Sequence, residues 1–150
     1  MSINRVSEAI EAIKRGEFVL VTDDEDRENE GDLIIAAEMA TPEKIAFMIK
    51  HTSGLITVPM SGERLDALNI PLMVTSNTEA HRTAFTISVD FLHGTTTGIS
   101  AKDRALTIQA LANEKSMPDD FSRPGHLFPL RYCEGGVLKR TGHTLSLIHI

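Results

Sequence analysis

The sequence predicts a single domain in which helices cover a mixed β-sheet. Two observations support this prediction. Segments with helical periodicity are interleaved with short β-rich runs, and they show no regular strand–helix–strand count. The chain has 150 residues with a hydrophobic content of 41% and a charged content of 24%, which are ordinary values for one globular domain. No internal repeat, low-complexity stretch or linker divides it.

One helix and two strands are predicted before residue 40. Apolar residues recur at the spacing of one helix face near the start of the chain, and Gly16 can end that helix. The residues of this face are Val6, Ala9, Ile10 and Ile13. The β-rich run 18–22 predicts a buried strand, and 33–36 predicts a second one, with an acidic segment between them.

A helix, a strand and a second, shorter helix are predicted in the middle of the chain. Thr41 is a candidate N-cap, and Pro42 follows at the first helical position. The apolar face of this helix consists of Ile45, Met48 and Ile49. Residues 55–58 predict a strand, and 61–68 predict a short helix that ends before Pro71.

The last third begins with an alternating run at 83–89, which predicts a half-buried strand. Ser100 and Asp103 match a capping box that opens a helix. The predicted apolar residues are Phe85, Ile87 and Val89 in the strand, and Ala105, Ile108 and Ala112 in the helix. From Arg123 onward, proline and glycine predict short strands and turns.

The net charge of −6 is concentrated in residues 23–32, whose sequence is DDEDRENEGD. This segment holds seven acids and one base, so it contributes −6 and the rest of the chain sums to zero. The absence of a basic stripe argues against a nucleic-acid surface. Glu28, Glu30 and Asp32 alternate, so an extended backbone would place three carboxylates on one face, an arrangement that suits a divalent cation. The alternative is a solvated acidic turn.

Three further polar segments stand out, and two of them are candidates for anion binding. Residues 139–144 combine two bases, a glycine and two hydroxyls, which suits a phosphate, and they include His143 as a candidate ligand. The Gly/Thr segment 94–100 leads into a helix N-terminus, where anions bind readily. For this segment and for 123–126, ordinary turn chemistry is the favoured alternative.

The start of the chain has no apolar h-region, and no apolar run is long enough to cross a bilayer. Cys133 is the single cysteine, so an intramolecular disulfide is impossible and a reducing compartment is expected. The sequence therefore predicts a cytoplasmic protein with no membrane partner and no nucleic-acid partner.

Taken together, these segments resemble the 3,4-dihydroxy-2-butanone 4-phosphate synthase family of riboflavin biosynthesis. The matching motifs run in order as far as Thr144. They are DDEDRENEGD at 23–32, SGL at 53–55, TAFT at 83–86, TTTGIS at 95–100, RPGH at 123–126 and GGVLKRTGHT at 135–144. The resemblance implies an α+β fold with three α/β/α layers and a mixed twisted sheet. It also implies a homodimer whose active sites lie near the interface.

The resemblance implies a lyase that converts ribulose 5-phosphate to 3,4-dihydroxy-2-butanone 4-phosphate and formate through metal-assisted enolisation and skeletal rearrangement. It implies Mg²⁺ as the cofactor, and Mn²⁺ is an expected substitute because imidazole favours transition metals. The implied metal ligands are Glu28 and His143, with Glu30 contributing through water. The implied catalytic residues are Asp23, Glu28 and His143. The implied substrate contacts are Arg27, Glu28, Asp32, Arg140, Thr141, Gly142, His143 and Thr144.

The chain departs from the family pattern in two places. Thr57 stands where many relatives carry a cysteine, so no thiol role is expected. After Thr144, relatives continue into a further helix, a strand and an essential glutamate, whereas this chain reads LSLIHI. That ending is also a translation of a transposase adaptor used in sequencing libraries. We therefore expect an incomplete synthase domain at 1–144, a non-native tail at 145–150 and no activity in the chain as written.

Two alternatives to a single-function synthase stay open. One is a non-catalytic relative that binds a sugar phosphate without turnover. The other is the N-terminal part of a bifunctional protein that also carries GTP cyclohydrolase II.

Overall fold

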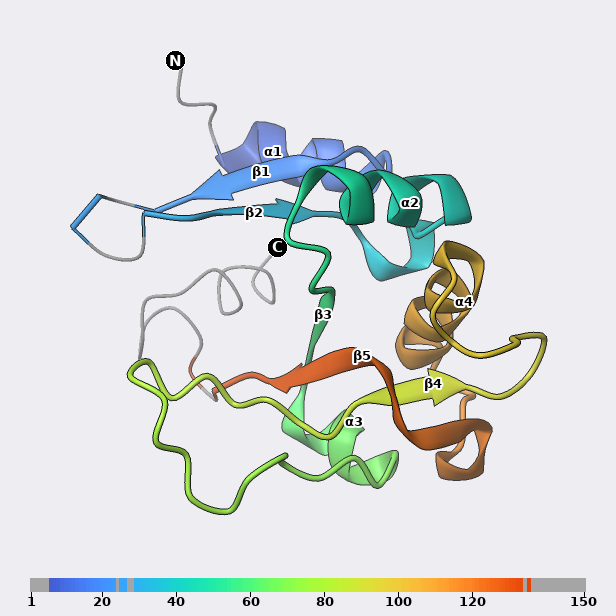
Figure 1. Ribbon diagram of the computed structural model, residues 1–150. Coiled ribbons are helices and arrows are strands. Elements are labelled where there is room, and N and C mark those ends of the chain that lie inside the picture. Colours follow the sequence, from blue (N-terminus) through green and yellow to red (C-terminus); the bar gives the residue numbers. More distant parts are fainter. Residues whose placement is uncertain (1–5, 24, 27–28, 134, 136–150) are drawn as a thin grey trace.

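The fold was analysed in a computed structural model, which describes residues 6–23, 25–26, 29–133 and 135 (Figure 1). The helices are α1 (Val6–Lys14), α2 (Pro42–His51), α3 (Gly62–Ala67) and α4 (Ala101–Ala112), with 3-10 turns at Ala37–Met39 and Pro118–Asp120. The strands are β1 (Val19–Thr22), β2 (Gly31–Ile34), β3 (Thr57–Met60), β4 (Val89–Phe91) and β5 (Phe121–Arg131).

The described strands form an antiparallel β1–β2 hairpin and a mixed sheet in the order β3-β5-β4. In the mixed sheet, β3 runs parallel to β5 and β4 runs antiparallel to it. Figure 1 places the hairpin and α2 above this sheet, α3 below it and α4 beside β4. The predicted α+β class with a mixed sheet is confirmed.

The hydrophobic core lies between α2, α3, α4 and the mixed sheet. Its most completely buried large side chains are Ile45, Leu65, Leu68, Val89, Leu111 and Leu127. Helix α4 packs against α2, β4 and β5, so it joins the sheet to the upper helices. In the described part of the chain, no helix has the length and apolar character needed to cross a membrane.

Three helices begin where the sequence predicts them. The side-chain oxygen of Thr41 accepts a hydrogen bond from the Lys44 amide, and Pro42 occupies the first turn of α2. Ser61 and Ser100 cap α3 and α4 in the same way. These helices are predictable because the cap satisfies backbone donors within one turn and needs no tertiary partner.

The prediction for the alternating run 83–89 is wrong about which of its side chains are buried. Only its last residue belongs to β4, and Thr86 is fully buried while Phe85 and Ile87 are partly exposed. The Thr86 hydroxyl donates to the carbonyl of Pro129 over 2.7 Å. The Pro129 carbonyl in β5 therefore satisfies the Thr86 hydroxyl. The alternation of polar and apolar residues in the sequence does not indicate this distant partner.

The first strand is also less buried than predicted. No residue of β1 is buried, and Leu20 is 64% exposed, because the only partner of β1 among the described strands is β2. The second strand begins at Gly31 and so lies two residues earlier than the predicted 33–36, and β3 lies two residues later than 55–58. Strand ends depend on cross-strand partners, which local composition does not encode.

The C-terminal region and α4 also differ from their predictions. Instead of breaking at Pro124, β5 continues from Phe121 to Arg131, because its pairing shifts register between Val89 and Asp90 of β4. This irregularity accommodates the residues that do not fit the regular hydrogen-bonding pattern between the two strands. In α4, Ala112 is exposed rather than buried because it is the last helical residue.

Candidate active site

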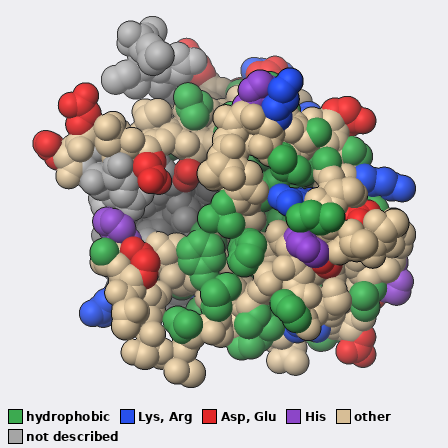
Figure 2. Space-filling model, viewed as in Figure 1, with side chains coloured by type: hydrophobic (Ala, Val, Ile, Leu, Met, Phe, Trp, Pro, Cys, Tyr) green, Lys and Arg blue, Asp and Glu red, His purple; other side chains and the backbone are tan. Residues whose placement is uncertain are grey.

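A cavity of about 830 Å³ opens between the β1–β2 hairpin, α2 and β3. Most of its lining is apolar, and its polar lining residues are Glu30, Asp32, His51, Thr52, Ser53 and Thr57. Figure 2 shows acidic side chains and a group of hydrophobic side chains on the same face of the molecule. The fold therefore brings the acidic segment 23–32 and the SGL turn 53–55 together around one cavity.

The acidic segment begins directly after β1 and ends inside β2, the two strands of the antiparallel hairpin. The Asp23 carboxylate accepts the Glu30 amide at 2.9 Å, and the Asp23 amide donates to the Glu30 carbonyl at 3.3 Å. Asn29 has φ +50°, so the backbone is not extended at this residue. Glu30 and Asp32 nevertheless both line the cavity.

Most of the predicted site residues lie outside the described residues. They are Arg27, Glu28, Arg140, Thr141, Gly142, His143 and Thr144. Among the residues that are described, no group of three His, Cys, Asp or Glu side chains is placed to hold a metal ion. Glu30 and Asp32 supply carboxylate oxygens, the donors that Mg²⁺ prefers, so the chemistry of the cavity rim fits the expected cation.

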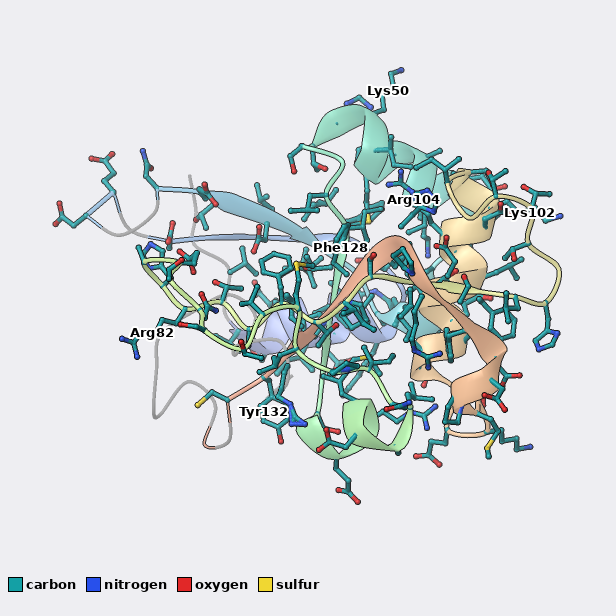
Figure 3. All side chains as sticks on the ribbon, turned by 60° about the horizontal axis from the view of Figure 1, so that its bottom comes forward. Lys50, Arg82, Lys102, Arg104, Phe128 and Tyr132 are labelled. Carbon is teal, nitrogen blue, oxygen red and sulfur yellow. The ribbon has the colours of Figure 1, made fainter. Side chains whose placement is uncertain are left out.

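The SGL turn is held from two sides. The Thr52 hydroxyl donates to the Met48 carbonyl at 2.7 Å and accepts the Gly54 amide at 3.2 Å. From α4, the guanidinium of Arg104 donates to the carbonyls of Gly54 at 3.3 Å and Ile99 at 3.0 Å. Figure 3 shows Arg104 on the side of α4 that faces α2. Arg104 thus ties the cavity turn to the Gly/Thr loop.

The Gly/Thr loop 94–100 does not present its backbone to an external anion. The Asp103 carboxylate accepts the amides of Thr96 at 3.1 Å and Gly98 at 3.0 Å, and also the Thr96 hydroxyl at 2.8 Å. Asp103 is 2% exposed, so the chain's own carboxylate fills the position. The predicted anion site is wrong here, and the alternative of turn chemistry is confirmed.

These hydrogen bonds make the loop sensitive to acid. The Thr96 hydroxyl, followed by the Thr96 and Gly98 amides, lowers the pKa of Asp103 below its ordinary value. A lowered folded-state pKa stabilises the fold above the unfolded pKa, and this stabilisation disappears as the pH falls through the folded value. The Asp103→Asn variant should therefore be less stable than wild type at neutral pH, with a difference that shrinks below about pH 4.

Urea unfolding of both proteins at a series of pH values measures this difference. Glu114→Gln is a matched control, because Glu114 is exposed just beyond the other end of α4. The control should follow wild type at every pH. A stability difference between wild type and Asp103→Asn that stays constant down to pH 2 would contradict the assignment.

The RPGH motif lies within β5 rather than in the predicted turn. The Arg123 guanidinium donates to the carbonyls of Leu68 at 2.7 Å, Pro118 at 2.9 Å and Phe121 at 2.9 Å. It therefore holds the end of α3 and the Pro118–Asp120 turn against the start of β5. This arginine stabilises the fold and is not directed at the cavity.

Sequence reasoning did not identify the pair formed by Asp90 of β4 and His126 of β5. The His126 ring Nδ1 lies 2.6 Å from Asp90 Oδ2, and the His126 amide donates to Oδ1 at 2.9 Å. The RPGH motif indicated the histidine, but its partner lies 36 positions earlier in the chain. No local pattern connects the two residues.

Comparison with known proteins adds to this geometry. Residues 7–150 match the family model described as 3,4-dihydroxy-2-butanone 4-phosphate synthase. The chain belongs to this family. A synthase of that name from Agrobacterium fabrum is 61% identical over 150 residues, which are 100% of this chain and 70% of the relative. The recognition of the family from its ordered motifs is confirmed.

Two further relatives extend the comparison. A solved structure of 3,4-dihydroxy-2-butanone 4-phosphate synthase in complex with two magnesium ions has a TM-score of 0.93 and 54% identity, and covers 96% of this chain and 67% of its own. The bifunctional riboflavin biosynthesis protein RIBA 1, chloroplastic, from Arabidopsis thaliana is 58% identical over 147 residues, which are 97% of this chain but 27% of that protein. The chain therefore spans 70% of the Agrobacterium relative but only 27% of the Arabidopsis one.

Proposed function

We propose that the full-length protein is a lyase that converts D-ribulose 5-phosphate to L-3,4-dihydroxy-2-butanone 4-phosphate and formate in riboflavin biosynthesis. The match of residues 7–150 to the synthase family is the observation that carries this proposal. The cavity between the acidic hairpin and the SGL turn supports it, because two family motifs that are distant in sequence meet there.

Glu28 and His143 would hold a divalent cation, Mg²⁺ or Mn²⁺ as its substitute, which supplies Lewis-acid polarisation of substrate oxygens when bound. The magnesium complex of a similar synthase supports the choice of Mg²⁺. The imidazole of His143 would also suit Mn²⁺. Glu30, on the cavity rim, would contribute through water.

Asp23 would exchange protons with the substrate. Enolisation beside a ketone requires a base to remove a proton from the adjacent carbon. One oxygen of Asp23 accepts the Glu30 amide, and this bond fixes the orientation of the carboxylate at the hairpin turn. Asp32, also on the rim, would accept hydrogen bonds from sugar hydroxyls.

The phosphate would bind away from the acidic rim. Glu30 and Asp32 would repel a phosphate dianion, whereas arginine binds phosphate through two parallel hydrogen bonds. We therefore place the phosphate with Arg140, Thr141, Gly142 and Thr144. Arg27 lies inside the acidic segment and would contact another part of the substrate. This separation would point the ketone end of the sugar toward the acidic hairpin.

We also propose that the protein acts as a homodimer in the cytoplasm, with a sugar phosphate as its ligand rather than a nucleic acid or a membrane. The non-native origin of 145–150, the domain end at 144 and the inactivity of the chain as written stay predictions, and these residues lie outside the described part. The bifunctional alternative is supported by the Arabidopsis relative, whose name describes two functions.

Formate release tests the proposed activity. The full-length protein supplied with ribulose 5-phosphate and Mg²⁺ should release formate in step with the four-carbon product. EDTA should abolish this release, and added Mg²⁺ or Mn²⁺ should restore it. Binding of ribulose 5-phosphate without formate release, with either metal present, would instead support the non-catalytic relative.

A further inference from the structure

A buried carboxylate and a partly exposed imidazole form a pair where β4 meets the beginning of β5. The side chain of Asp90 is 10% exposed and that of His126 is 39% exposed. Neither residue lines the cavity at the hairpin. The predicted ligands and substrate contacts do not include this pair, so a part in the reaction requires the sugar phosphate to reach from the cavity to the His126 ring.

The two hydrogen bonds determine which ring nitrogen carries the proton. An ionised carboxylate can only accept hydrogen bonds. Asp90 Oδ1 accepts the His126 amide at 2.9 Å, and Oδ2 lies 2.6 Å from Nδ1 of the same residue. Nδ1 must therefore carry a proton and donate it to Oδ2. In the neutral ring, Nε2 then keeps its lone pair.

The carboxylate is fixed by the Gly/Thr loop. A Cβ added at Gly98 would overlap the Asp90 carboxylate, so only a glycine allows this approach. The Gly98 amide is in turn held by Asp103 at 3.0 Å. On β5, the Gly125 amide donates at 3.1 Å to the hydroxyl of Ser88, the residue just before β4. The loop and β5 together restrict rotation of Asp90.

We propose that Asp90 is a positioning residue that fixes His126 in the Nδ1–H tautomer and so leaves the lone pair of Nε2 as a proton acceptor. The chemical use of this lone pair rests on the proposed function, because enolisation and rearrangement of a sugar phosphate require proton transfers. A proton would leave a substrate carbon or hydroxyl for Nε2, and the electron pair of the broken bond would stay on the substrate. The Asp90 carboxylate would compensate the charge of the imidazolium, which returns the proton later.

A pair that serves only to hold β4 against β5 is the competing explanation. Both explanations predict that the loss of Asp90 lowers stability, so stability cannot distinguish them. The turnover rate distinguishes them, because only the positioning role predicts that loss of the Nδ1–H tautomer lowers kcat while KM stays little changed.

Nitrogen-15 NMR of histidine-labelled, full-length protein measures the tautomer directly. The His126→Gln variant identifies the His126 signals by their disappearance. At a pH high enough for the wild-type His126 ring to be neutral, Nδ1 should give a protonated signal and Nε2 an unprotonated one. The reverse assignment in wild type would overturn the proposal without any variant of Asp90.

The Asp90→Asn variant completes the test, because an amide can donate to Nδ1 as well as accept from it. We expect loss of the Nδ1–H preference and a fall in kcat for formate release of about 100-fold, with KM little changed. Asp120→Asn is the matched control, since Asp120 contacts the more exposed His93 at 2.9 Å. This control should leave the His126 signals and kcat unchanged.

Two results in Asp90→Asn would overturn the proposal: an unchanged tautomer, or a changed tautomer with an unchanged kcat. If wild type released no formate, the proposed function would fail instead. The tautomer of wild type and of Asp90→Asn would then still decide whether Asp90 positions the ring.

Discussion

Glu28→Gln in the full-length protein is expected to lower the rate of formate release by about 100-fold or more. The substitution keeps the size of the side chain but removes the negative charge that would hold a divalent cation. His143→Ala should have a similar effect, because it removes the second proposed ligand. Formate release at saturating ribulose 5-phosphate and Mg²⁺ measures both losses.

Glu25→Gln provides the matched control for Glu28→Gln. Glu25 belongs to the same acidic segment and is exposed in the hairpin turn. We expect this variant to retain most of the activity. All three variants should unfold within about 1–2 kcal/mol of wild type, because they lie in polar segments rather than on apolar faces. Equal losses of activity at positions 25 and 28 would mean that the segment acts through its total charge and not through specific ligation.

The parts of the fold that sequence predicts well are those governed by contacts within one turn of helix. Thr41, Ser61 and Ser100 all cap helices in the structure, because the hydroxyl and the amide that it satisfies lie three residues apart. The helix starts follow from this local chemistry. The acidic segment was likewise placed correctly between two strands.

The buried side of a strand is harder to predict, because it depends on a distant partner. Thr86 has the polar character of an exposed residue but is fully buried, since the Pro129 carbonyl accepts its hydroxyl. The burial of Leu20 depends on which segments pack on the β1–β2 hairpin, and among the described residues Leu20 is 64% exposed. Alternation in sequence identifies two sides of a strand but not which side is covered.

The candidate site shows the same division between local and distant information. The Gly/Thr loop has the composition of an anion site, and it does bind an anion, but that anion is the carboxylate of Asp103. The sequence contains both partners within a few residues, yet it does not indicate that the carboxylate turns back toward the loop. The Asp90–His126 pair is beyond local reasoning altogether, since β4 and β5 meet only after folding.

Gly98→Ala is expected to lower the free energy of unfolding by about 2–5 kcal/mol, which combines backbone strain with steric overlap. Gly98 has φ +90°, a conformation that alanine adopts at a cost, and the added methyl group would overlap the Asp90 carboxylate. The overlap can be relieved only by moving Asp90 or the loop. Moving Asp90 breaks its hydrogen bonds to His126, and moving the loop breaks the bond from Gly98 to Asp103.

Gly94→Ala separates these two contributions. Gly94 lies in the same loop with φ +76°, but an added Cβ there would only approach a Leu106 methyl group at 3.9 Å. Gly94→Ala should therefore lower the free energy of unfolding by about 1–2 kcal/mol, as expected for backbone strain alone. Urea unfolding measures both losses, and the nitrogen-15 signals of His126 report the geometry of the pair. Gly98→Ala should lose the Nδ1–H preference while Gly94→Ala keeps it. Equal unfolding free energies and identical His126 signals in the two variants would show that the loop does not hold Asp90 against His126.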